Sequence, residues 1–518
     1  MRTKINKEIM DIFSYLTDWL VSAIKPEYDK SEIKKYAEKG NKPLAGIVAA
    51  LWKLFDTHIC EGKEKMFRTK GKGKDMTLYA FNERWFEEVD GEAFLKELVR
   101  RVLTAIEVSP AYQFYAPVKI AKELLGKISH SPECVYEPNR RYICFTNGVL
   151  DLQESKSKRF KPFSIDRITD IILDFPYDER ATSMLWRVKL GDKKQGIIPN
   201  TGLCADFQQF CGSLLADRTK YKKEYVCYLY GGGGNGKSVL AAAIANVFGE
   251  RYYSTFSLQQ IFTKQTNGMF VAKEMDGKLL NWCDDVDEKD VSGGEFKRFV
   301  SGESIPGRKP FGVDFTKIRP PMLLCCINTF PDVKDNSDGN HRRQLIIETT
   351  KKQWEAAERD TELAAKLSTT ESRQAIFNWI LEGYDKFVRN GGDIKLSEDS
   401  KMARATRLAL SNPMRRWAYE RNFTIAAPKD DSDPRWRRLV DWYADYKAYC
   451  EENGCNNPEN SRKVAEMFRS MGFREKRASQ GTMFCVGVKA HDTDENGGYI
   501  DPVLRKMENE ARESGNIL

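Results

Sequence analysis

Residues 231–238, GGGGNGKS, join a run of glycines to a lysine and a hydroxyl side chain. Gly231, Gly236, Lys237 and Ser238 have the spacing G-x-x-x-x-G-K-S. Glycines let successive backbone N–H groups turn toward one anion, the lysine can reach the β and γ phosphates of a nucleotide, and the serine hydroxyl can ligate Mg²⁺. The motif predicts an ATP-binding site made of consecutive residues: Gly231, Gly232, Gly233, Gly234, Asn235, Gly236, Lys237, Ser238 and Val239.

The flanks of this motif decide between a phosphate-binding loop and a flexible linker. A linker is polar on both sides, whereas here the apolar run YVCYLY (225–230) precedes the glycines and KSVLAAAIANVF (237–248) begins at the lysine. A strand that leads into a helix directs the positive N-terminal end of the helix toward the same anion. We therefore expect a strand, a phosphate-binding loop and a helix in this order.

Two aspartates end the apolar run KLLNWC (278–283). At this position Asp284 or Asp285 can hold Mg²⁺, and the other can polarise an attacking water. The alternative is a solvated acidic turn, because more acidic residues follow at 287–290. The phosphate-binding motif upstream favours the catalytic interpretation and leaves open which aspartate is the base. Asn281 is a polar residue inside the apolar run, and the sequence gives no reason for it.

Polar residues also flank the next two apolar runs. Asn328 ends PMLLCCIN (321–328), where an amide can sense a γ-phosphate or orient water, although an Asn at a strand end is ordinary. Arg342 and Arg343 precede QLIIET (344–349). An arginine there can stabilise charge on the nucleotide of a neighbouring subunit; the alternative is a solvent-facing or salt-bridged pair.

Short apolar runs that alternate with helical stretches between residues 205 and 350 indicate an α/β domain with a buried sheet. Helical periodicity dominates before this domain, interrupted by RTKGKGKD (68–75), which we expect to be a surface loop or hairpin tip. The predicted segments are a mainly helical N-terminal domain (1–130), an α+β segment with a turn at Asn147-Gly148 (131–204), the α/β core (205–350), a helical segment and linker (351–427), a small helix-helix-hairpin domain (428–500) and a tail (501–518).

Composition sets limits on the class of protein. The 83 Lys+Arg are nearly balanced by 75 Asp+Glu, so only local basic clusters would argue for a nucleic-acid partner. The 12 cysteines include no CxxC pair and no zinc-ligand spacing, which indicates reduced thiols in the cytoplasm. Residues 9–24 have helical periodicity interrupted by charges, so we expect an amphipathic helix, no membrane span and a soluble protein.

The order of these motifs resembles the superfamily 3 helicases, a compact branch of the AAA+ ATPases. More narrowly, it resembles the helicase part of the primase-helicases of phages, plasmids and poxviruses. The runs FTNGVLDL (145–152) and FPYD (175–178) look like the stretch before the helicase in that family, and FKRFVSGESIPGRKPFGVDF (296–315) looks like the region of its DNA-binding hairpin. The chain departs from the family in Ser301-Gly302-Glu303, and in Asp284-Asp285 where Ser-Glu is frequent.

The resemblance implies an AAA+ P-loop core that forms a homohexamer and uses ATP and Mg²⁺. Arg343 would be the finger that acts on a neighbouring subunit, with Arg342 as the alternative. The implied catalytic residues are Lys237, Asp284, Asp285, Asn328, Arg343 and Arg342, and the implied metal ligands are Ser238, Asp284 and Asp285.

Basic residues supply two candidate DNA contacts. The family's single-strand hairpin would fall at Arg308 and Lys309 beside Phe311, with Lys297 and Arg298 in support, since translocation uses cations for phosphates and aromatic rings for bases. The C-terminal domain resembles a winged helix with clustered cations: Arg462, Lys463, Arg469, Arg474, Lys476 and Arg477. The alternatives are a salt-bridged loop and a solvated helix face.

The expected function is that of a replicative DNA helicase of a phage, plasmid or other mobile element, acting in the host cytoplasm on single-stranded and forked DNA. With only 4 histidines and a helical first part, the chain shows no sign of a primase domain, so we expect a separate primase or polymerase partner. Two other classes stay open: a nucleotide-dependent origin-binding or scaffold protein, and a P-loop ATPase that is not a helicase. The first 130 residues would form an oligomerisation collar or a partner-docking domain.

Overall fold

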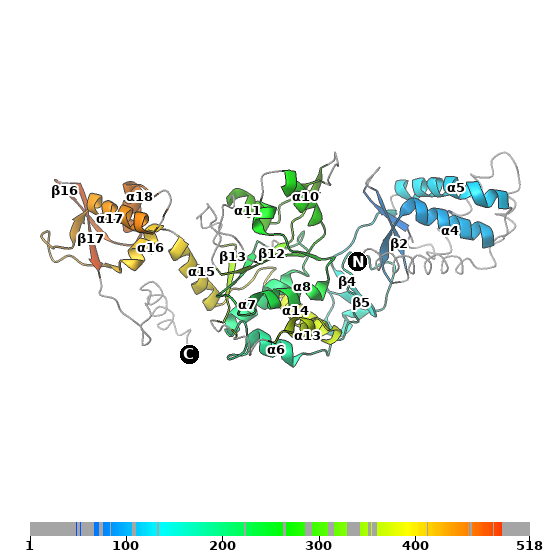
Figure 1. The fold of residues 1–518 in the computed structure, drawn as a ribbon, viewed down its shortest axis with the longest axis horizontal. Coiled ribbons are helices and arrows are strands. Elements are labelled where there is room, and N and C mark those ends of the chain that lie inside the picture. The colour runs from blue at the N-terminus through cyan, green and yellow to red at the C-terminus, as the bar shows by residue number, and fades with distance from the viewer. Residues whose placement is uncertain are drawn as a thin grey trace. The chain divides into compact units, whose positions relative to one another are not determined.

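The computed structural model forms two compact units, Met1–Arg180 and Ala181–Leu518 (Figure 1). The residues that it describes are 48, 52, 67–71, 76–82, 84–105, 110–131, 134–221, 224–262, 266–284, 293–308, 315–328, 342–350, 354, 360–411, 413–453, 455, 458–479 and 481–488. The predicted helix at 9–24 and the tail at 501–518 lie outside them. No helix in the described part is long and apolar enough to cross a membrane.

The described part of the first unit contains an antiparallel sheet of order β1-β2-β3 and two helices that pack on each other. Their bounds are β1 (Phe67–Lys70), β2 (Thr77–Phe81), β3 (Phe86–Val89), α4 (Gly91–Ala105) and α5 (Pro110–His130). Three short strands therefore interrupt the segment predicted as mainly helical, and the hairpin expected around 68–75 agrees with the antiparallel pairing of Lys70 with Thr77. These strands have only four or five residues, too few for their alternation to stand out between long helical patterns.

A second antiparallel sheet follows, with strands β4 (Tyr142–Phe145), β5 (Gly148–Asp151) and β6 (Phe160–Lys161) and the 3₁₀ helix η3 (Lys156–Lys158). The strand-like texture and the turn predicted here are confirmed, because Phe145 pairs with Gly148. The unit ends at Arg180, so the segment predicted as 131–204 is divided: its last part begins the second unit.

One buried carboxylate ties this second sheet together. Asp151 accepts hydrogen bonds from Arg141 at 2.6 and 2.7 Å and from Lys161 at 3.0 Å. Burial alone would raise the pKa of Asp151, but the hydrogen bonds from these two cations outweigh burial and lower its pKa to about 2. The carboxylate therefore stays charged and holds β4, β5 and β6 together.

A five-stranded parallel sheet is the centre of the second unit, in the order β13-β7-β12-β9-β8. Its strands are β7 (Val226–Tyr230), β8 (Tyr253–Ser254), β9 (Leu280–Asp284), β12 (Met322–Ile327) and β13 (Gln344–Glu348). The four apolar runs predicted as strands are confirmed as β7, β9, β12 and β13. Every residue of β12 is buried, as expected for a parallel strand covered on both faces.

Helices cover this sheet (Figure 1): α7 packs against β13, α8 packs against β9 and β12, and α14 packs on both α7 and α8. The helices and hairpin strands around the sheet are α6 (Met184–Gly191), α7 (Thr201–Ser213), α8 (Lys237–Phe248), α9 (Leu258–Ile261), α10 (Thr266–Glu274), α11 (Gly293–Val300), β10 (Ile305–Gly307), β11 (Thr316–Ile318), α13 (Leu363–Leu367), α14 (Thr370–Arg389) and α15 (Glu398–Ser411). The helix predicted over 237–248 is confirmed as α8.

The C-terminal part of the chain has its own aromatic core around Trp417 and Phe468. Its elements are α16 (Pro413–Glu420), β14 (Phe423–Ile425), β15 (Trp436–Arg438), α17 (Leu439–Glu452), α18 (Ser461–Ser470), β16 (Arg474–Ala478) and β17 (Gly481–Val488). The predicted order of two helices and a hairpin is confirmed by α17, α18 and β16-β17. The predicted start at 428 is too late, because Trp417 is fully buried in this core and stacks on Phe468 at a centroid distance of 5.8 Å.

Candidate functional site

The glycine-rich loop lies at the carboxyl end of β7 and leads into α8, which begins at Lys237. Gly234 and Gly236 have φ angles of 72° and 88°, a left-handed conformation that favours glycine. Gly231 is required for a different reason, because a Cβ atom there would lie 2.2 Å from Oγ1 of Thr349. A Cβ atom on Gly233 would meet no atom within 4 Å. The loop therefore needs glycine at three of these positions and not at Gly233.

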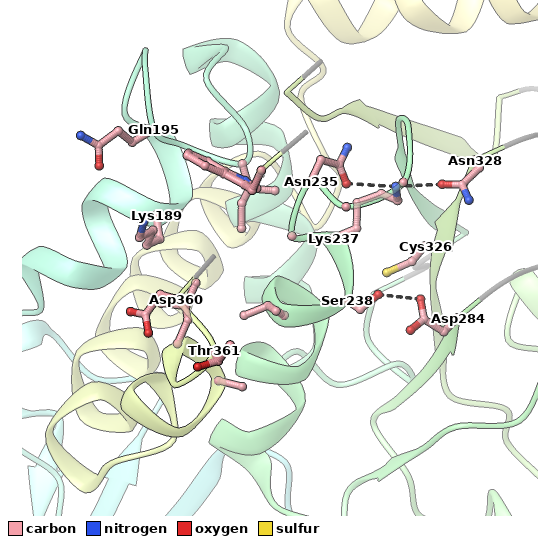
Figure 2. Close-up of a pocket in the computed structure, with 18 residues that line it drawn as sticks. Lys189, Gln195, Asn235, Lys237, Ser238, Asp284, Cys326, Asn328, Asp360 and Thr361 are labelled. Carbon is pink, nitrogen blue, oxygen red and sulfur yellow. Dashed lines mark hydrogen bonds between the residues drawn. The ribbon is translucent and has the colours of Figure 1, made fainter. Parts of the chain in front are cut away.

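The Lys237 side chain is held at the centre of the loop. Its Nζ atom donates to the carbonyl oxygens of Gly231 and Gly232 at 2.8 and 2.7 Å, and to Oδ1 of Asn235 and Asn328 at 3.0 Å each (Figure 2). Asn328 follows β12, the strand next to β7 in the sheet. The structure thus brings together the lysine and the amide that the sequence placed 91 residues apart.

Ser238 and Asp284 face each other beside this lysine (Figure 2). The Ser238 hydroxyl donates to Oδ1 of Asp284 at 2.8 Å. Asp285 lies outside the described residues, so only one of the two predicted aspartates has a described position. Cys326 lines the same cavity, and burial raises the pKa of its thiol to about 12, so it is an uncharged wall residue.

Asn281, the polar residue that the apolar pattern does not explain, holds strand β9 in place. Its buried amide accepts from Oγ of Ser254 at 2.8 Å and from N of Phe256 at 3.1 Å, and donates to O of Phe256 at 2.9 Å. These bonds tie β9 to the segment beside it. The residue is thus a structural amide three positions before Asp284.

Lys237, Ser238, Asp284 and Asn328 line one cavity of about 470 Å³. This cavity continues past the glycine-rich loop. Its first end, named the phosphate end after the sequence prediction, is formed by residues 233–239 with Asp284, Cys326 and Asn328. Its second end is formed by residues that the sequence reasoning missed: Lys189, Gln195, Ile197, Trp354, Asp360, Thr361, Leu363 and Ala364. They come from segments far apart in the chain and share no spacing, so no sequence signal would have grouped them.

Asn235 connects the loop to the chain after β13. Its side chain is 2% exposed and donates to Oγ1 of Thr349 at 2.6 Å and to O of Thr350 at 3.2 Å. The backbone N of Trp354 donates to O of Gly234 at 3.3 Å. The second end of the cavity is therefore hydrogen-bonded directly to the glycine-rich loop.

The two arginines before β13 have different environments. The Arg343 side chain is 12% exposed and contacts Glu224 at 3.2 Å and Oγ of Ser301 at 3.2 Å. The Arg342 side chain is 66% exposed and lies 3.7 Å from the same Glu224 carboxylate. Arg343 is thus held by contacts within the chain, whereas most of Arg342 is exposed.

The predicted hairpin is confirmed as β10-β11, which are antiparallel, but its predicted DNA contacts are only partly described. The Arg308 guanidinium lies over the rings of Phe270 and Phe315, at 5.6 and 5.5 Å from their centroids. Phe315 is 60% exposed. Lys297 is half-buried on α11, and both Lys309 and Phe311 lie outside the described residues.

Four of the six cations predicted in the C-terminal domain have acidic partners. The pairs are Arg462 with Glu466, Lys463 with Glu459, Arg469 with Glu475 and Lys476 with Asp431. Arg474 and Arg477, on β16, form no ion pair among the described residues. The exposed face of α18 is therefore balanced in charge, whereas β16 carries two unbalanced positive charges.

The known proteins that match the chain are only distantly similar to it. A family model described as a family of unknown function, DUF5906, matches residues 229–343. A solved apo structure of the NrS-1 C-terminal region (305–718) is 13% identical with a TM-score of 0.40, and covers 82% of this chain and 96% of that chain. An A-form apo structure of the NrS-1 C-terminal region is 11% identical with a TM-score of 0.37, and covers 80% and 94%. No curated protein matches the chain. Structural likeness at this level carries no conclusion about function.

Proposed function

We propose that the chain is an ATP- and Mg²⁺-dependent DNA helicase of the superfamily 3 type, acting as a hexameric ring in the replication of a phage, plasmid or other mobile element. The observation that carries the proposal is the convergence of Lys237, Ser238, Asp284 and Asn328 in one cavity at the carboxyl edge of a parallel sheet. Ligands of open α/β sheets bind at this edge. The AAA+ core and the winged helix are parts of the same proposal.

The residues of the phosphate end fit a nucleotide with Mg²⁺. A serine hydroxyl and a carboxylate 2.8 Å apart are oxygen donors of the kind that Mg²⁺ prefers. Lys237, now held by two backbone carbonyls and two amides, supplies the positive charge for the β and γ phosphates. The N-terminal end of α8 adds a partial positive charge at the same place. When bound, Mg²⁺ would neutralise developing negative charge on the phosphates.

The arginine that acts on the neighbouring subunit is better assigned to Arg342 than to Arg343. A residue that reaches another subunit has to be accessible, and Arg342 is 66% exposed whereas Arg343 is 12% exposed. Arg343, in contact with Glu224 and Ser301, would instead position the start of β13. The expected result is that Arg342→Ala abolishes ATP hydrolysis and leaves ATP binding, whereas Arg343→Ala lowers stability and activity together.

The proposal includes two places of contact with DNA. The cations Arg308 and Lys297 and the exposed ring of Phe315 offer contacts for phosphates and bases near the β10-β11 hairpin. The unbalanced charges of β16 offer a second contact for duplex DNA.

The experiment that tests the proposal measures ATP hydrolysis and the unwinding of a forked duplex at several salt concentrations. The full chain is compared with Lys237→Ala and with the exposed control Lys193→Ala. If the chain is a helicase, we expect it to unwind the duplex, and we expect unwinding to weaken as the salt concentration rises. Lys237→Ala should lose unwinding and keep DNA binding, whereas Lys193→Ala should keep both. A rate of ATP hydrolysis that does not change when single-stranded DNA is added would indicate an ATPase of another kind. Binding of duplex DNA without unwinding would indicate an origin-binding or scaffold protein.

A further inference from the structure

The second end of the cavity differs in chemistry from the phosphate end. In Figure 2, Lys189, Gln195, Asp360 and Thr361 lie across the cavity from Asp284 and Asn328. The apolar part of this second end consists of the buried Ile197, the half-buried Trp354 and Leu363, and Ala364. An aromatic and aliphatic surface beside a phosphate-binding loop suits a flat ring joined to a phosphate chain.

We propose that this second end is a nucleobase subsite that binds the base by stacking and apolar contact and discriminates little between bases. The inference rests on the proposed nucleotide-binding function and names how the nucleoside is recognised. The backbone bond from Trp354 to Gly234 places the Trp354 residue next to the phosphate loop. A nucleoside triphosphate bound at the loop would therefore direct its base toward this wall.

Weak discrimination follows from the polar groups at this end. The backbone N of Ile197 donates to O of Lys189 at 2.9 Å, and its O accepts from N of Thr350 at 2.8 Å. Both carboxylate oxygens of Asp360 accept from Lys366 at 3.0 Å. The Lys189 ammonium lies over the Trp354 ring, 5.3 Å from its centroid. Each of these groups already has an intramolecular partner.

The two other polar side chains of the subsite, Gln195 and Thr361, are exposed. Among the described residues, none of the buried side-chain polar atoms that lack a partner belongs to this lining. Strong selectivity, of about 10⁴-fold or more, comes from buried polar groups that the wrong ligand leaves unpaired, whereas apolar pockets discriminate by about 10²-fold or less. We expect ATP and GTP to bind within about tenfold of each other.

The test is isothermal titration calorimetry of the full chain with ATP, GTP and inorganic tripolyphosphate, each with Mg²⁺. Both nucleotides are expected to bind more tightly than tripolyphosphate, which has no base. Trp354→Ala is expected to weaken the binding of ATP and of GTP by about tenfold, which is the effect of losing one stacking contact, and to leave the affinity for tripolyphosphate unchanged. Trp354→Phe keeps an aromatic ring and is expected to retain most of the nucleotide affinity.

The outcomes separate the subsite from the wider function. Three results would each overturn the inference. The first is equal affinity for ATP and tripolyphosphate, and the second is an equal loss of affinity for all three ligands in Trp354→Ala. The third is a preference of more than about hundredfold between ATP and GTP. If none of the three ligands binds to the unaltered chain, the proposed nucleotide-binding function itself fails. Unchanged tripolyphosphate binding in Trp354→Ala also shows that the variant is folded.

Discussion

The hydroxyl of Ser238, in the first turn of α8, donates a hydrogen bond to Oδ1 of Asp284 at the end of β9, 46 residues later. The two oxygen atoms that could ligate a metal ion are thus adjacent. Because hard oxygen ligands in this arrangement suit Mg²⁺, removing either side chain should weaken the binding of the metal ion and leave the rest of the cavity intact.

Asp284→Asn is therefore expected to lower Mg²⁺-dependent ATP hydrolysis by about 10²-fold, which corresponds to a loss of about 2.7 kcal/mol of charge stabilisation in the transition state. Steady-state hydrolysis with increasing Mg²⁺ checks this expectation. The matched control is Asp276→Asn, an exposed aspartate outside the cavity. An Asp284→Asn protein with unaltered turnover would remove Asp284 from the site.

The glycines of the loop should not be equivalent. Gly236→Ala forces a residue with a Cβ atom into a left-handed conformation, which costs about 1–2 kcal/mol, and brings that atom 2.9 Å from Cδ1 of Ile197. A Cβ atom in Gly233→Ala meets no protein atom within 4 Å, so this variant is expected to lose less stability and less nucleotide affinity than Gly236→Ala. Nucleotide affinity and melting temperature of the two variants provide the check, and equal losses in both would contradict it.

Duplex binding by the C-terminal domain should depend more on β16 than on α18. Arg474→Ala with Arg477→Ala removes two cations without an ion pair, so the slope of log K against log salt should fall by about 2 if both contact phosphates. Arg462→Ala with Lys463→Ala, the matched control, removes cations already paired with Glu466 and Glu459 and should change the slope less. Fluorescence anisotropy of labelled duplex DNA measures both slopes; a larger loss in the α18 variant would reverse the assignment.

The Asp151 carboxylate makes the stability of the first unit depend on pH. Its pKa falls from the ordinary 3.8 to about 2 on folding, so its contribution of about 2.5 kcal/mol is present above pH 4 and is lost as the pH falls toward 2. Asp151→Asn should therefore weaken hydrogen-exchange protection of β4 and β5 at pH 6, and the difference from the unaltered chain should shrink toward pH 3. A difference that stays constant with pH would show that the charge is not the cause.

The sequence predicted those parts of the structure whose signal is local. The strands β7, β9, β12 and β13 are apolar runs, and polar residues at their ends mark one edge of the sheet. The missed features depend on contacts between distant segments. The second end of the cavity joins Lys189 to Trp354, and the burial of Trp417 against Phe468 moves the boundary of the C-terminal domain. Residue spacing carries no information on such pairs.

Asn281 also bears on how accurately the chain folds. Adjacent positions of a strand point to opposite faces, so a slip of one residue in β9 would turn Asp284 away from Ser238. An apolar side chain at 281 would tolerate such a slip, because its neighbours in the strand are apolar as well. The buried amide does not, since a shifted strand would leave its hydrogen-bonding groups unsatisfied. Asn281 thus specifies the register of β9 and disfavours folded molecules in which a shifted β9 would leave the site inactive.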